Sequence, residues 1–135
     1  MPLILATRIL LYAQIVLGTL QSPGLYNGVP GILHTHRTLA FIIPVVAFFA
    51  FGPHRSAPGG LARVFARYGP AAALILGLIN WVGFKMLAAI PVEAYFAVMG
   101  VHMLVGIAVV AFVEISAGKD RRARIAAQSE NATAQ

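Results

Sequence analysis

Residues 94–116, AYFAVMGVHMLVGIAVVAFVEIS, form an apolar run with no charged side chain before Glu114. An α-helix needs about 20 such residues to cross the ~30 Å hydrocarbon core of a bilayer. Three further apolar runs lie at about residues 3–20, 33–51 and 70–90. Continuous runs of this length predict helices, because a backbone in lipid must satisfy its own hydrogen bonds. The sequence therefore predicts an all-α, integral membrane four-helix bundle.

Composition supports a membrane protein rather than a soluble one. The chain has 135 residues, of which 59% are hydrophobic and only 10% are charged, whereas soluble domains carry about 25% charged residues. The net charge of +6 comes from residues that flank the apolar runs, so we expect a lipid bilayer and no nucleic acid as the partner. The absence of cysteine excludes disulfides, thiolate metal sites and covalently attached c-type haem.

The positive charges also predict the topology. Lysine and arginine gather in the second connection, residues 52–69, and after residue 116. By the positive-inside rule, both segments and the N-terminus face the cytoplasm, so the N- and C-termini are expected to be cytoplasmic in a multi-pass protein of the cell inner (plasma) membrane. The first run follows Met1 without a cleavage site and is expected to remain as a helix. Residues 1–116 are expected to form the bundle, and residues 117–135 a basic, disordered cytoplasmic tail.

Ionisable and amide side chains within the runs are costly in lipid and are candidate functional residues. Arg8 and Glu114 lie near the inner ends of the first and fourth helices, where they either pair or extend to the headgroups. Lys85, in the outer half of the third helix, either extends to the outer headgroups or pairs with an anionic cofactor group or with Glu93. The amides of Gln14 and Asn80 lie mid-span and predict hydrogen bonds between helices.

The histidines suggest a cofactor site near the outer face. Side chains from facing helices of a bundle build such sites, and two imidazoles can bind a haem iron from opposite faces. His102 lies in the outer half of the fourth helix, while His34 and His36 open the second. Residues i and i+2 point about 200° apart, so one of these two faces the core; we favour the deeper His36, with His34 as the alternative. One haem b is expected on His36 and His102, with Arg37 and Lys85 pairing with its propionates.

Short motifs carry a resemblance to a known family. They are Gln14-Ile15-Val16-Leu17-Gly18, His36-Arg37, Leu76-Gly77, Pro91 and His102. They resemble one half of the heme A synthase family, whose usual members have two homologous four-helix halves, and they cover nearly the whole chain except the tail. The resemblance implies that His36 and His102, which are 66 residues apart, are the haem-ligand histidines.

The sequence also departs from that family. Its catalytic half has a glutamate three residues before the His-Arg histidine, where this chain has Leu33, and its outer-loop cysteine pair is absent here. The chain is therefore more similar to the haem b-holding half, and the resemblance assigns no catalytic residue. A half-length member of the family would be plausible as a homodimer.

These observations favour a membrane b-type cytochrome. Two axial ligands leave the iron no open position, which favours electron transfer over oxygen chemistry. A chain with so little mass outside the membrane suits a subunit of a larger respiratory or photosynthetic complex. One alternative is a half-size heme A synthase-like oxidoreductase acting on haem as a homodimer, with Glu93 as the only acidic residue on the outer side. The other is a non-catalytic structural membrane subunit.

Overall fold

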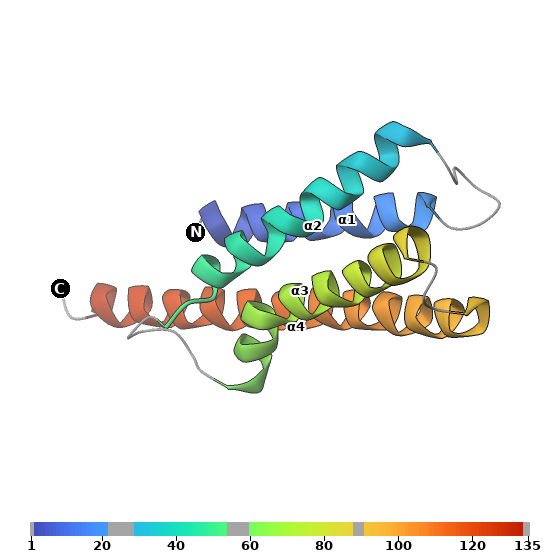
Figure 1. Ribbon diagram of the computed structural model, residues 1–135. Helices are drawn as coiled ribbons and strands as arrows, with labels where there is room; N and C mark the ends of the chain where they lie inside the picture. The colour runs from blue at the N-terminus through green and yellow to red at the C-terminus, as the bar shows by residue number, and fades with distance from the viewer. Residues whose placement is uncertain (1, 22–28, 54–59, 88–90, 134–135) are drawn as a thin grey trace.

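The computed structural model describes residues 2–21, 29–53, 60–87 and 91–133 (Figure 1). Four helices in this part of the chain are long and apolar enough to cross a membrane, which confirms the predicted all-α fold with four candidate membrane spans. The third of them continues from an α-helix into a π-helical segment, η1. The elements are α1 (Pro2–Leu20), α2 (Pro30–Ala50), α3 (Leu61–Leu78), η1 (Ile79–Met86) and α4 (Val92–Thr133).

Consecutive helices run antiparallel, and both ends of the chain lie at the same end of the bundle (Figure 1). In the described residues, α1 packs on α2, α2 on α3, α3 on α4, and α4 on α1, while the backbones of α1 and α3, and those of α2 and α4, do not approach one another as closely. The four helices therefore form a ring in which α2 and α4 are diagonal. We call the end near Pro2 and Ala50 the termini end, and the end near Leu20 and Pro30 the histidine end.

The helix starts follow from local backbone chemistry. Pro30 opens α2, where a missing N–H costs nothing because that donor has no partner within the helix. Gly60 precedes α3 with φ of +115°, a conformation that glycine adopts without a steric penalty. Its carbonyl accepts hydrogen bonds from the N–H groups of Arg63 and Val64 at 3.0 and 3.2 Å, so α3 begins at Leu61. The prediction of a start near Pro70 was wrong, and Pro70 lies inside the helix.

The predicted disordered tail is also different in the structure. Helix α4 continues as far as Thr133, and only residues 134–135 of the tail lie outside the described residues. After Gly118 the segment contains no glycine or proline and is rich in alanine and arginine, which favour a helix. Asp120 also bonds to Arg63 of α3 at 2.8 Å, which attaches the start of the extension to the bundle.

The apolar core occupies the bundle from its middle to the termini end. It consists of eight buried residues from the four helices and the residue after α2: Leu11, Ile43, Ala47, Ala50, Phe51, Ala66, Val109 and Val113. Most are small or medium-sized, so the helices approach one another closely there. Arg63 and Asp120 are buried beside this core, and a second nitrogen of Arg63 donates to the carbonyl of Gly52 at 3.1 Å.

The two helical hairpins, α1–α2 and α3–α4, repeat one packing register. In α2 and α4, buried residues follow His36 and His102 by 7, 11 and 14 positions. In α1 and α3, buried residues precede Gly18 and Gly77 by 11 and 7 positions. The matched pairs are Ile43 with Val109, Ala47 with Val113, Ala50 with Ser116, Thr7 with Ala66, and Leu11 with Pro70. His36 and His102 therefore take equivalent positions, at the same depth from the core.

Candidate functional site

His36 lies in the second turn of α2, half-buried against α1. A Cβ atom added to Gly18 would lie only 3.1 Å from Cε1 of the His36 ring, so the glycine is what lets the imidazole approach this helix. The Gln14 amide nitrogen lies 3.4 Å from His36 Nε2, at the long limit of a hydrogen bond. His36 Nδ1 is buried and has no hydrogen-bond partner among the described residues. The ring is thus placed by packing more than by hydrogen bonding.

His102 lies in α4 and packs against α3 in the same manner. A Cβ atom added to Gly77 would lie 3.3 Å from Cε1 of the His102 ring. The Nδ1 atom lies 3.0 Å from the carbonyl oxygen of Ala73, and because a carbonyl only accepts, Nδ1 carries the proton. Nε2 then keeps its lone pair. A carbonyl on one ring nitrogen is the arrangement that orients metal-binding histidines.

The structure thus brings the two predicted ligand histidines to equivalent places on diagonal helices. His34 is exposed and lies on the other side of α2, which favours His36 over His34. The remaining histidine, His54, falls outside the described residues.

Arg37 and Lys85 are the two side chains that the sequence predicts as partners of the haem propionates. Arg37 lies next to His36, and its guanidinium carbon is 4.2 Å from the ring centre of Trp81 in η1, a cation–π contact. This contact holds the Arg37 side chain toward the third helix. The backbone of Lys85 is part of η1, but the Lys85 side chain is not among the described parts of the structure.

Buried polar atoms without a partner among the described residues occur at both ends of the bundle: Arg63 Nε, Arg67 Nε and Ser116 Oγ toward the termini end, and five atoms at the histidine end. Sequence reasoning placed Gln14 and Asn80 in hydrogen bonds between helices. Gln14 has only the long contact with His36, and the prediction for Asn80 was wrong, since neither of its amide atoms has a partner in the described structure. The five atoms at the histidine end are Gln14 Oε1, Gln21 Nε2, His36 Nδ1, Asn80 Nδ2 and Asn80 Oδ1. Gln21 was not considered from the sequence, although it lies three residues after Gly18, as Asn80 lies three after Gly77.

The termini end also carries paired charges. Arg8 bonds to Glu114 at 2.7 Å, so of the two predicted alternatives for these residues the structure has the pair. The Tyr12 hydroxyl donates to the same carboxylate oxygen at 2.9 Å. A hollow of about 570 Å³ adjoins this pair, between α1 and α4. Its charged side chains have partners or lie at the bundle surface, and no histidine lines it.

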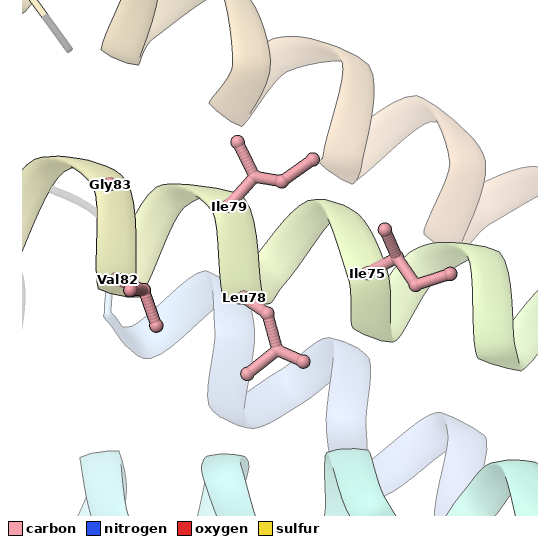
Figure 2. A pocket seen from close by; sticks show the side chains of 5 residues that line it. All are labelled: Ile75, Leu78, Ile79, Val82 and Gly83. Atoms are coloured by element: carbon pink, nitrogen blue, oxygen red, sulfur yellow. The ribbon is translucent and has the colours of Figure 1, made fainter. Parts of the chain in front are cut away.

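A second hollow, of about 380 Å³, is lined only by apolar residues of α3 and η1. Figure 2 shows Leu78 and Val82 pointing to one side of this helix and Ile79 to the other. Ile75, Ile79 and Val82 are exposed, so the hollow opens on the surface that faces lipid. Neither His36 nor His102 lines it, and we do not assign the cofactor to it.

The residues at the histidine end fit a haem rather than a metal ion held by protein alone. No group of three or more His, Asp or Glu side chains that could hold a metal ion occurs among the residues that the structure describes. A haem iron needs only two protein ligands, because the porphyrin supplies four. His102 offers an oriented Nε2, His36 offers a buried nitrogen without a partner, and both rings lie against glycines.

Comparisons with protein-family models, curated proteins and solved structures found no match to this chain. The interpretation of the site therefore depends on its own residues and their geometry.

Proposed function

We propose that the protein is a membrane b-type cytochrome that holds one haem b between His36 and His102 and transfers electrons. The observation that carries this proposal is the equivalence of the two histidines. Each lies against a glycine of the neighbouring helix, each precedes the same buried positions, and the two stand on diagonal helices of the bundle. Bundle cores with ligands on facing helices are where such cofactors are held.

The protein residues have separate tasks in this proposal. The Ala73 carbonyl fixes the His102 tautomer and would leave Nε2 free to bind the iron. Gly18 and Gly77 let the imidazoles stand close to their neighbouring helices. Bound haem supplies a one-electron redox couple, and two imidazole ligands leave no open position for oxygen. Arg37, held by Trp81, is available to pair with a propionate.

The proposal includes an orientation in the membrane. The basic side chains of residues 61–67 and 119–124 lie toward the termini end, which the positive-inside rule assigns to the cytoplasm. The haem would then lie toward the outer face of the inner membrane. As in the prediction from sequence, the protein would work with other membrane subunits or as a homo-oligomer.

The test is a reduced-minus-oxidised absorption spectrum of the detergent-purified protein with three variants. His36→Ala and His102→Ala each remove one proposed ligand, and His34→Ala is the matched control, since its imidazole is exposed on the same helix. We expect a low-spin b-type spectrum in the wild type and in His34→Ala. Both ligand variants should lose the low-spin signal while keeping their helical circular dichroism.

Three outcomes would count against parts of the proposal. A folded wild-type protein with no haem signal contradicts the cytochrome and the synthase alternative together, and leaves the structural subunit. A signal lost in His34→Ala but kept in His36→Ala would reverse the ligand assignment. Haem extracted with an oxidised methyl group would favour the heme A synthase-like alternative, which lacks a glutamate at Leu33 and has only the exposed Glu93 at this end.

A further inference from the structure

Asn80 is the most deeply buried polar side chain at the histidine end, with an exposed fraction of 6%. Both of its amide atoms lack a partner in the part of the chain that the structure describes. A buried amide without hydrogen bonds is unfavourable, and more so in lipid, where no water replaces them. It also lies in a π-helical segment, a geometry that is frequent at functional sites. A bound polar group would remove this cost.

The neighbours of Asn80 show which way its side chain faces. Gly77, three residues earlier, contacts the His102 ring of α4. Trp81, the next residue, contacts Arg37 of α2. Residues three apart share one side of a helix, and Asn80 is itself buried, so Asn80 lies on the side of the third helix that contacts α4, next to the position that contacts α2. This is the side that faces the proposed haem, about one turn nearer the histidine end than His102.

The first hairpin carries an amide at the equivalent position. Gln21 follows Gly18 by three residues, as Asn80 follows Gly77, and its amide nitrogen is also buried without a partner among the described residues. Both positions therefore present an unpaired N–H donor just beyond the histidine layer. Two unpaired donors call for a ligand with two acceptors, and Arg37 adds a positive charge nearby. Carboxylates are the groups that such donors and an arginine bind best.

We propose that Asn80 and Gln21 are positioning residues that hold the two carboxylates at the polar edge of the haem, one from each hairpin. This inference rests on the proposed function, because it needs haem on His36 and His102. It adds two amides to the arginine and lysine expected from the sequence. The inference also assigns a role to Trp81, because its contact with Arg37 would keep that guanidinium beside the same carboxylates.

The experiment compares two forms of the cofactor. Protein purified from haem-starved cells is loaded with haem b or with its dimethyl ester, in which both carboxylates are blocked. The rate of transfer to excess apomyoglobin is then measured for the wild type, Asn80→Leu and Gln21→Leu. We expect each variant to release haem b about tenfold faster or more, which is the effect of losing a hydrogen bond to a charged group. With the dimethyl ester, wild type and variants should release the cofactor at the same rate.

Ser116→Ala is the matched control. Ser116 is also a buried polar residue whose side-chain oxygen has no partner among the described residues, but it lies at the termini end, so its release rates should equal those of the wild type. Equal release of haem b from wild type and both amide variants would overturn the inference and leave the cytochrome proposal standing. Faster release of both cofactor forms would overturn it too, since the amides would then act on the fold. A wild type that takes up no haem would end both proposals.

Discussion

The two ends of the bundle share one register but are filled differently. At the termini end, the repeated positions hold mostly apolar side chains, and a buried ion pair lies beside them. At the histidine end, no residue of the apolar core occurs among the described positions, and the buried side chain is that of Asn80. The unpartnered polar atoms of Gln14, Gln21 and His36 lie there as well.

We infer from this difference that the termini end contributes most of the stability and that the histidine end holds the candidate site. Close packing and the ion pair at the termini end hold the four helices together. In the proposed function, the polar groups at the histidine end would take their partners from a ligand, and the packed end would offset the cost of leaving them unpaired in its absence. The glycines show the same contrast between the two ends. A Cβ atom added to Gly69 at the packed end would meet the apolar side chain of Val109, whereas one added to Gly18 or Gly77 would meet an imidazole.

The largest effect should come from breaking the buried ion pair at the packed end. Arg63 and Asp120 bond at 2.8 Å with side-chain exposures of only 9% and 8%. Asp120→Ala leaves the Arg63 charge buried and unpaired, which typically costs about 3–5 kcal/mol. We expect this loss in the free energy of unfolding, measured by denaturant titration in detergent micelles.

The adjacent Arg121→Ala is the control, because Arg121 is exposed, and its effect should stay within about 0.5 kcal/mol. The double variant Arg63→Met with Asp120→Leu should recover most of the stability, since apolar side chains often replace a buried pair without loss. Equal stability of Asp120→Ala and Arg121→Ala would show that the termini end does not depend on this pair.

A smaller effect should separate two glycine-to-alanine variants. A Cβ atom at Gly69 would lie 2.7 Å from Cγ2 of Val109, whereas one at Gly106 meets no atom within 4 Å. Both variants gain helix propensity of roughly 1 kcal/mol, but only Gly69→Ala overpacks the helix contact, at a cost of about 1–3 kcal/mol. The free energies of unfolding should differ by that amount.

Adding Val109→Ala tests the cause of that difference. The substitution removes the atom that the new methyl group would meet, so it should cost less in the Gly69→Ala background than in the wild type. If Gly69→Ala and Gly106→Ala have the same stability, or if the two substitutions are simply additive, the helices at the packed end have room to move apart.

The sequence predicts the spans well, because hydropathy and span length are local properties. The four apolar runs appear in the structure as helices, and of the two alternatives left open for Arg8 and Glu114 the structure has the pair. The start of α3 and the helical tail do not follow from hydropathy. Arg63 and Asp120 read as solvated loop and tail residues, yet they meet across 57 positions of sequence, a contact that no local pattern contains.

The candidate site was predicted in part. Helical geometry requires one of His34 and His36 to face away from the core, and the structure exposes His34. The sequence contains the equivalence of the hairpins as a repeated spacing, since Gly18 precedes Gln21 by three positions and Gly77 precedes Asn80 by three. What could not be predicted is which amide finds a partner, because that depends on how far apart the helices stand. Asn80 was expected to bond to another helix and has no such bond among the described residues.

The smallest effect on the fold should come from the glycines at the histidine end. Gly77→Ala places a methyl group 3.3 Å from the His102 ring, and Gly18→Ala places one 3.1 Å from the His36 ring. Each ring is only half-buried, unlike the buried Val109 at Gly69, and a shift of a few tenths of an ångström would relieve a contact of this length. The gain in helix propensity, roughly 1 kcal/mol, should then offset the crowding. We expect free energies of unfolding of the haem-free protein within about 1 kcal/mol of the wild type.

Haem binding should respond where stability does not. A displaced imidazole no longer meets the iron in its oriented position, and for His102 the shift also strains the hydrogen bond to the Ala73 carbonyl. Both variants should therefore retain less haem during purification, with Gly106→Ala as the unaffected control on the same helix as His102. If Gly77→Ala instead destabilises the haem-free protein as strongly as Gly69→Ala does, the histidine end is packed as tightly as the termini end. The separation of stability from function along the bundle would then be wrong.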